Sequence, residues 1–469
     1  MGSTLFFGDL VSKKRLAQLI DFENREKLFP AVDSRMKFCV LAMGAAERAN
    51  FAFFLTNAMQ LDEVERRFTL TADQIARINP NTKTAPVFRS RADAELTAKL
   101  YGRAPVLIEE RSAEQGGDVN PWGITFQRMF DMSNDSGIFR DPQRLELEGW
   151  TREGTDWVRD AASSIERRVP LYEAKMIHHY DHRWATYAGG SADDEEAARD
   201  CTLAEKQNPH FEPSPRYWVP EDEVKLRAAR VPSSLKRAYR EINSDRCLKA
   251  LSEWVAGYFT NVEGRVAREA DLVRVLGKSH AWKTALGASP ERFLLEPKTL
   301  ANGVDMQRET PLSADDIAFL TQGPDEPLEL TTALIERKQP RWLMGWRDIT
   351  NATNERTVVN AVFPLVGTGD TLLLKYPVVN DAKLSAALSA VLSSMTLDYI
   401  CRQKIGGTHL KYNVFKQNSV LPPSSFVASD LAFITPRVLE LTYTTHAMRP
   451  WGEDLGFTGT PQGCSTLTT

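Results

Sequence analysis

Three short apolar runs near the N-terminus predict strands. The runs Leu16–Asp21, Phe38–Met43 and Phe51–Leu55 are separated by turn-forming residues. Apolar runs of this length are typical of buried strands in an α/β sheet. Phe6 and Phe7 are expected in a further buried strand. Because an α/β domain contains several strand–helix units, the pattern predicts a sheet without its N-terminal half.

From about residue 60 the apolar positions follow a helical period instead. Residues 71–78 and 90–101 predict short helices, and Asn79-Pro80 ends the first. Gly116–Asp156 is expected to be mostly loop, and residues 189–200 form a predicted acidic surface loop. Residues 224–285 are predicted to be helical, with one buried face that comprises Trp254, Val255, Tyr258 and Phe259.

The last third of the chain returns to mixed patterns. Residues 289–340 are polar and contain several prolines, so we expect a connector or an insertion. Strands are predicted at 341–346 and 357–363. A single helix is predicted over 383–403, with Leu384, Leu388, Leu392 and Met395 on one face, and a strand at 409–414.

These elements predict a mixed α+β (α/β) fold in four parts. Residues 1–60 are expected to be a partial Rossmann-like sheet. Residues 61–425 form a mixed domain that includes the helical segment 224–285 and the connector 289–340. Residues 426–457 are a predicted C-terminal helical segment, and 458–469 a disordered tail without apolar periodicity.

Composition excludes several classes of protein. Of the 469 residues 42% are hydrophobic and 26% charged, which excludes wholesale disorder. The net charge of −4 does not predict a predominantly basic surface of the kind that binds nucleic acid. No apolar run of about 18 residues predicts a membrane span. A cytoplasmic location is expected, because no signal peptide is recognisable and five scattered cysteines suit reduced thiols: Cys39, Cys201, Cys247, Cys401 and Cys464.

One histidine-rich segment, HHYDHRW at residues 178–184, admits three interpretations. If it were helical, His178 and His182 would share a face and could hold zinc. Alternatively, the mixture of Lys175, Arg183 and aromatic residues suits phosphate and base contacts in nucleic acid. The histidines could also be ordinary structural residues.

Two basic stretches contain no acidic residue and favour DNA. They are Val224–Arg240 and Tyr399–Lys416. Cations near phosphates displace counterions and give salt-dependent affinity. Solvated helix faces can gather cations without any ligand, which is the alternative here. The candidate DNA contacts from the histidine-rich segment and these stretches are Lys175, His178, His179, His182, Arg183, Lys225, Arg227, Arg230, Lys236, Arg237, Arg240, Arg402, Lys404, Lys411 and Lys416.

An ordered series of short motifs resembles one family. It includes Leu19–Arg25, Phe88–Glu95, Asn120–Gly123, Met129–Asn134, Leu171–Arg183, Arg216–Pro220, Arg347–Ile349, Gly406–Leu410 and Leu421–Pro423. Together they resemble, over residues 8–457, large adenine-specific DNA methyltransferases of Type IIG restriction-modification and BREX-type phage-defence systems. The resemblance implies the end of a methylase domain followed by a target-recognition domain that grips duplex DNA. It adds Arg347 and His409, which lie in matched motifs, to the candidate DNA contacts.

The family's catalytic motifs are missing from this chain. Methylation of adenine N6 requires a flipped base held by an Asn-Pro-Pro-Tyr or Asn-Pro-Pro-Phe clamp. The Asn-Pro pairs here continue differently, at Asn79-Pro80-Asn81, Asn120-Pro121-Trp122 and Asn208-Pro209-His210. The glycine-rich S-adenosylmethionine loop is missing too. We therefore expect no catalytic, cofactor or metal residues in this chain, and a separate polypeptide that supplies S-adenosylmethionine binding and catalysis.

Two rival hypotheses remain. One is a methyltransferase with an unconventional active site around Asp131–Asp135, although no cofactor loop accompanies these residues. The other is a decayed gene fragment without function. A restriction nuclease is disfavoured, because no convincing paired Asp and Glu-x-Lys metal motif is recognisable.

Overall fold

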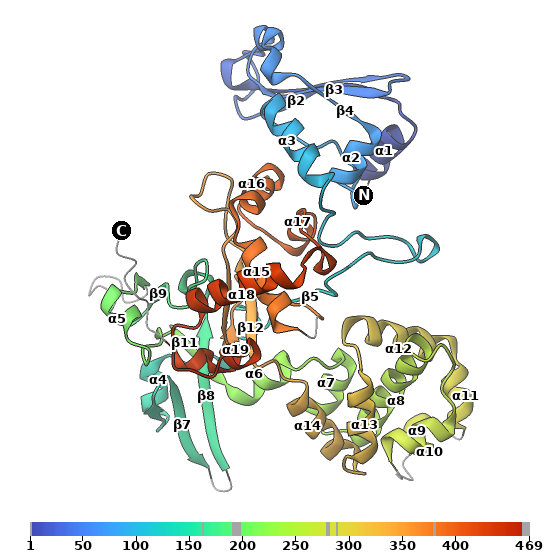
Figure 1. The fold of residues 1–469 in the computed structure, drawn as a ribbon, viewed down its shortest axis with the longest axis vertical. Helices are drawn as coiled ribbons and strands as arrows, with labels where there is room; N and C mark the ends of the chain where they lie inside the picture. The colour runs from blue at the N-terminus through green and yellow to red at the C-terminus, as the bar shows by residue number, and fades with distance from the viewer. Residues whose placement is uncertain are drawn as a thin grey trace.

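A helix and a four-stranded sheet form the N-terminal lobe of the computed structural model, which describes residues 2–161, 164–189, 198–277, 282–287, 289–378 and 381–461 (Figure 1). The three predicted strands are confirmed as β1 (Leu16–Glu23), β2 (Lys37–Met43) and β3 (Arg48–Leu55). Together with β4 (Phe68–Thr71) they have the order β2-β1-β3-β4. Only β1 and β3 are parallel.

Two expectations for this lobe were wrong. Phe6 and Phe7 lie in helix α1 (Gly2–Ser12) rather than in a strand. The edge strand β2 is not buried, since Val40 and Met43 are 55% and 58% exposed. Short apolar runs do not distinguish a helix from a strand, or a buried strand from an edge strand with an uncovered face.

The buried side of the lobe follows the two-residue alternation of β3 and β4. Phe51 pairs with Phe68, and both side chains are buried. The helices α2 (Ala72–Ile78) and α3 (Arg91–Tyr101) follow the sheet in the chain, as predicted. Thr71 caps α2 in a reciprocal pair of hydrogen bonds with Gln74, which satisfies free backbone donors.

The central body contains two mainly antiparallel sheets, in which only the short β14 pairs in parallel, with β8. One has the order β13-β12-β15-β5; in the other, β11-β8-β7-β6, the short strand β14 also pairs with β8. The predicted strands near 341–346 and 357–363 are confirmed as β12 and β13. The bounds are β5 (Thr125–Gln127), β6 (Thr151–Glu153), β7 (Asp156–Ala161), β8 (Ser164–Tyr172), β9 (Ala185–Thr186), β10 (Arg199–Asp200), β11 (Tyr217–Pro220), β12 (Trp342–Arg347), β13 (Asn360–Pro364), β14 (Gly367–Thr368) and β15 (Leu372–Tyr376).

Helices cover this body, and two of them correct the predictions. The expected helix 383–403 is two helices, α15 (Ala382–Leu392) and α16 (Met395–Lys404), which meet at 60°. Ser394 caps α16 and so starts a new helix, which leaves Met395 79% exposed. The expected strand at 409–414 is replaced by α17 (Tyr412–Phe415). The other helices are α4 (Pro142–Leu147), α5 (Leu203–Gln207), α18 (Ala428–Thr442) and α19 (Arg449–Asp454).

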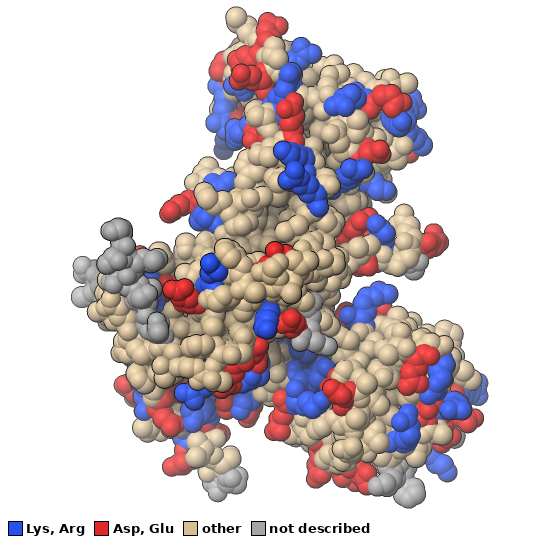
Figure 2. All heavy atoms as spheres, viewed as in Figure 1, with Lys and Arg blue, Asp and Glu red and all other residues tan. Residues whose placement is uncertain are grey.

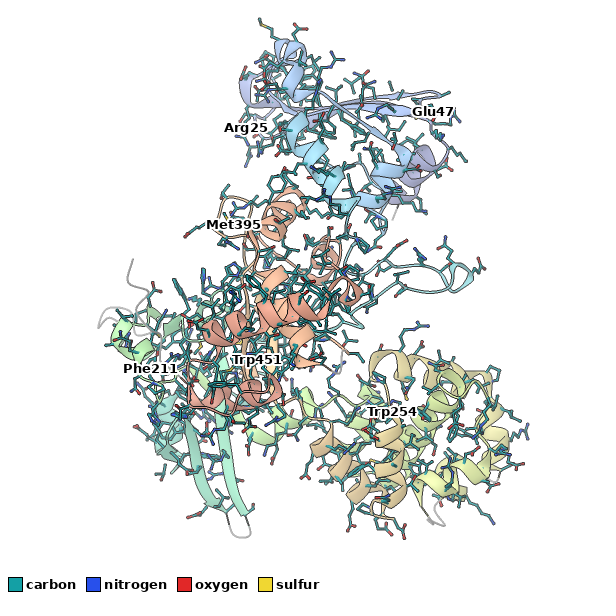
Figure 3. All side chains as sticks on the ribbon, in the orientation of Figure 1. Arg25, Glu47, Phe211, Trp254, Met395 and Trp451 are labelled. Atoms are coloured by element: carbon teal, nitrogen blue, oxygen red, sulfur yellow. The ribbon has the colours of Figure 1, made fainter. Side chains whose placement is uncertain are left out.

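A separate helical lobe lies between β11 and β12 in the chain. The predicted helices of 224–285 are present, and 289–340 is no connector but contains four further helices of the same core. Helix α8 is its buried centre, marked by Trp254 in Figure 3. Helix α6 (Glu221–Ala228) packs on the central body and leads into the lobe. The helices of the lobe are α7 (Ser233–Arg240), α8 (Ser244–Asn261), α9 (Glu269–Leu276), α10 (Trp282–Leu286), α11 (Pro290–Leu295), α12 (Pro297–Glu309), α13 (Ala314–Gln322) and α14 (Pro327–Arg337).

Close backbone approaches hold this lobe together. Helices α8 and α12 cross at Gly257 and Gly303, and a Cβ added to Gly257 would lie 1.9 Å from the Gly303 carbonyl oxygen. At the root of the lobe, the Arg230 amide donates to the Lys338 carbonyl at 2.8 Å. The chain therefore leaves and re-enters the central body at one point.

The fold is thus mixed α+β, with 19 α-helices and four sheets in the described residues. No single helix among them is long and apolar enough to cross a membrane, and α15 with α16 meets that criterion only as a bent pair. Most of the predicted acidic loop 189–200 and of the predicted disordered tail 458–469 lies outside the described residues.

Candidate nucleic-acid interface

The histidine-rich segment is a tight turn rather than a helix. The His178 and Asp181 backbones exchange hydrogen bonds of 2.7 and 3.0 Å around Tyr180, whose φ is +59°. The helical spacing that would place His178 and His182 on one face is therefore not formed. No group of three or more His, Cys, Asp or Glu side chains in the described ranges is placed to hold a metal ion.

Two of the predicted DNA contacts in this segment are interior residues. Arg183 is 1% exposed and donates to the carbonyls of Lys206 and Asn208 at 2.7 and 2.9 Å. His182 is fully buried, with Nε2 3.3 Å from the carboxylate of Glu212. Because neither side chain reaches the surface, we assign both a structural role: they fix the chain around α5.

The other histidines lie closer to the surface. The His178 ring lies 4.4 Å from the Trp184 ring, in a tilted arrangement. His179 is half-buried, and this burial lowers its pKa to about 4, so the ring is neutral at neutral pH. Lys175 is exposed. Arg347 donates to the Ile177 carbonyl at 2.8 Å and so stabilises the chain next to the turn. Burial lowers the pKa of Arg347.

Three of the six cations of the first basic stretch have carboxylate partners from outside it. Arg227 binds Asp135 at 2.8 Å and Glu223 at 2.9 Å, and Arg240 shares Glu223. Lys225 pairs with Glu221 at 2.9 Å. These cations are neutralised within the fold, which reduces what they can offer a phosphate.

The remaining three cations of this stretch differ from one another. Arg230 is largely buried over the Tyr376 ring, 4.4 Å from its centroid. Lys236 donates to the Arg227 carbonyl at 2.6 Å, and burial lowers its pKa to about 7, helped by the charge of Arg230. Arg237 is exposed, and its side chain has no partner among the described residues.

The second basic stretch is also largely paired. Arg402 binds Asp398 at 2.8 Å, and Lys416 binds Glu110. Lys404 is directed into the junction with the N-terminal lobe, where it donates to the Ile78 carbonyl at 2.6 Å and to Asn79 Oδ1 at 3.1 Å. Lys404 and Lys416 join distant parts of the chain, whereas Arg402 and Asp398 lie one turn apart in α16.

A buried carboxylate organises the two remaining candidates. Asp348 is 1% exposed, and its Oδ2 lies 2.8 Å from His409 Nδ1 and 2.6 Å from Lys411 Nζ. Both partners are about half exposed, at 52% and 50% of their side chains. Asp348 therefore holds two exposed polar groups in fixed positions beside each other, which is suited to contact with a polar ligand.

A third group of basic side chains, which the sequence does not predict, lies in the N-terminal lobe. Arg48, Arg67, Arg91 and Lys99 line an open groove of about 560 Å³ between β3–β4 and α3. Figure 2 shows Lys and Arg side chains interspersed with Asp and Glu on this lobe, while the front of the central body is mostly uncharged. The four residues are spread over 52 positions and interspersed with acids, so no basic stretch marks them in the sequence.

The segment Val366–Asp370 contains Gly367 and Gly369 but does not form an open loop that fits S-adenosylmethionine. Gly367 lies in the buried strand β14 (Gly367–Thr368). A Cβ at Gly367 would lie 2.7 Å from Val219 Cγ2, so protein atoms already fill the space.

Comparison with known proteins adds no family. No protein-family model, no curated protein and no solved structure matches this chain.

Proposed function

We propose that this protein is the DNA-recognition portion of a site-specific adenine-N6 DNA methyltransferase from a restriction-modification or phage-defence system. A separate polypeptide would bind S-adenosylmethionine and transfer the methyl group. The ordered motif series over residues 8–457 supports the assignment to this class. We propose a cytoplasmic location for the protein, because its DNA substrate would lie there.

The observation that carries the proposal is the open edge of the N-terminal sheet. Strand β2 pairs only with β1, and Val40 and Met43 are more than half exposed. Phe29 and Met36, beside this strand, are also 52% and 55% exposed. An unpaired edge with apolar side chains favours pairing with another chain. A catalytic polypeptide with the rest of such a sheet would cover this edge.

Three exposed features support contact with duplex DNA. They are Lys175 beside the histidine turn, Arg237 on α7, and the pair His409 and Lys411 held by Asp348. All are accessible to a phosphate backbone. The proposed interface is therefore smaller than the one predicted from the sequence, because the other candidate cations are bound to carboxylates or carbonyl groups of the protein itself.

Fluorescence anisotropy with a labelled duplex tests whether the chain binds DNA. We expect binding with a steep salt dependence, and each of Lys175→Glu and Arg237→Glu should lower the log–log salt slope by about 1. Lys298→Glu, an exposed lysine on α12, is the matched control and should leave the slope unchanged. Methyl transfer from labelled S-adenosylmethionine by the purified chain alone would refute the split arrangement.

Co-purification with the product of an adjacent upstream reading frame tests whether a catalytic polypeptide binds the edge strand β2. Val40→Lys with Met43→Lys should abolish complex formation and methyl transfer by the pair. Met59→Lys is the control, because Met59 is 81% exposed in the same lobe but outside β2. If no such reading frame accompanies the gene and the chain binds no DNA, the decayed fragment is the better explanation.

A further inference from the structure

We propose that the groove between β3–β4 and α3 is a second phosphate-binding site, which holds a run of nucleic-acid backbone phosphates in the N-terminal lobe. This inference rests on the proposed function for the source of the phosphates. The groove is distinct from the basic stretches of the sequence and lies in the lobe that would otherwise serve only to contact the catalytic partner.

The polar floor of the groove follows from strand alternation. Asn50 on β3 pairs with Thr69 on β4, and both are exposed, as is Arg48 two residues before Asn50. The intervening residues Ala49 and Phe51 are buried on the opposite face of the sheet. One face of the same strand pair therefore builds the core, and the other presents hydrogen-bonding groups to solvent.

The groove's wall comes from one stripe of α3. Arg91, Glu95 and Lys99 are spaced four residues apart and so project from the same side of the helix. Glu95 forms no ion pair with either cation within the 4.0 Å limit, although this spacing permits one. Both cations of the stripe are therefore free of an internal carboxylate partner among the described residues.

Two arginines are held in place while keeping donors free. Arg48 Nε donates to Thr69 Oγ1 at 2.9 Å, and Arg91 Nε donates to the Arg67 carbonyl at 3.0 Å. Both Nη groups of Arg91 and the Nη1 group of Arg48 have no partner in the described part of the chain. Fixing a guanidinium by one edge reduces the entropy lost when its other edge binds a ligand.

The charge of the groove points to an anion. Four cations and a single carboxylate line it, in a chain whose net charge is −4. The side chains of Arg67 and Lys99 have no partner among the described residues and are exposed. Such cations repel one another, and an anion between them relieves that repulsion.

The chemistry of the donors selects phosphate. Guanidinium groups bind phosphate oxygens with two parallel hydrogen bonds, and a lysine adds a point charge. An open groove with a volume of about 560 Å³ accommodates more than one phosphate group and does not enclose a base. The same chemistry would accept a free oligophosphate, so the experiment includes both sources.

The test uses the full chain and the double variant Arg67→Glu/Lys99→Glu. Anisotropy is measured with a labelled duplex of mixed sequence, and inorganic tripolyphosphate is titrated separately by calorimetry. At about 0.15 M salt, losing two phosphate contacts should weaken duplex binding about 30-fold and lower the salt slope by about 1.8, which is the effect expected of Arg67→Gln/Lys99→Gln. The Glu variant should weaken binding further, because its carboxylates also repel the phosphates.

The matched control is Arg292→Glu/Lys298→Glu, which makes the same charge change on exposed residues of the helical lobe. Circular dichroism confirms that the variants fold. If the chain binds duplex DNA and the groove variant binds as tightly as the control, the inference is overturned and the proposed function stands. If the chain binds no duplex but the groove captures tripolyphosphate, the site is real and the proposed function fails. Binding of neither ligand overturns both.

Discussion

Lys404 joins the N-terminal lobe to the central body through a buried ammonium group. It extends from the end of α16 to the Ile78 carbonyl at 2.6 Å and to Asn79 Oδ1 at 3.1 Å, beside the Tyr101 ring. No carboxylate among the described residues lies within ion-pair distance of its ammonium group. Burial lowers the pKa of Lys404 from 10.5 to about 7. The junction therefore contains an amine that loses its proton in the folded state far more readily than in water.

The consequence is a stability that rises with pH. Below pH 7 the amine is protonated in both states, and its burial cost is fully present. Between about pH 7 and pH 10.5 the unfolded chain keeps a proton that the folded chain has released, so the free energy of unfolding increases. A shift from 10.5 to about 7 corresponds to about 5 kcal/mol over this window, or about 1.4 kcal/mol per pH unit.

Lys404→Met removes the titrating group and keeps an unbranched side chain of similar length. Denaturant unfolding at several pH values between about 8 and 9.5 should give a slope lower by about 1.4 kcal/mol per pH unit than in the wild type. Lys383→Met removes one positive charge from the exposed start of α15 and is the control. Lys236 also contributes to the wild-type slope, but it is present in every variant.

If the free energy of unfolding of Lys404→Met and of the wild type rises equally with pH, Lys404 is not the titrating group. An equal change of slope in the Lys383→Met control would also refute this assignment. The absolute stability of Lys404→Met is not diagnostic, because two acceptors lose their donor and each costs about 1–3 kcal/mol.

Two further substitutions test the packing that positions these lobes. Gly257→Ala should destabilise the protein by about 3 kcal/mol in denaturant unfolding, since its Cβ would clash with Gly303, whereas Gly407→Ala, with no atom within 4 Å, should be near neutral. Arg183→Met should cost about 3–5 kcal/mol because several buried carbonyls lose their donor, without changing the DNA affinity of the folded fraction. A stable Arg183→Met variant with weakened DNA binding would contradict the structural role of Arg183.

Local signals in the sequence predicted the elements that they control directly. The strands β1 and β3 follow from apolar runs, and α2 and α3 begin at Thr71 and Ser90, which cap them as N-terminal residues should. The division of 383–403 was missed because the apolar period continues across Ser393 and Ser394. The helices of 289–340 were missed because each is short and several begin with proline, which is favoured at a first turn but resembles a loop signal.

The candidate interface was harder to predict, because charge is neutralised by partners far away in the chain. Arg227 meets Asp135, Lys411 meets Asp348, and Lys416 meets Glu110. A stretch that contains only cations therefore says little about its charge in the folded protein. Conversely, the groove of the N-terminal lobe gathers cations from a strand, a loop and a helix, which no linear pattern reveals.

The single attachment point of the helical lobe has an evolutionary consequence. Since the chain leaves and returns where the Arg230 amide meets the Lys338 carbonyl, everything between them can be lengthened, shortened or exchanged without moving a strand of the central sheets. Recombination at these two positions would exchange the helical lobe and leave the rest of the scaffold unchanged. Selection on what the protein contacts would then act on an interchangeable module rather than on the whole fold.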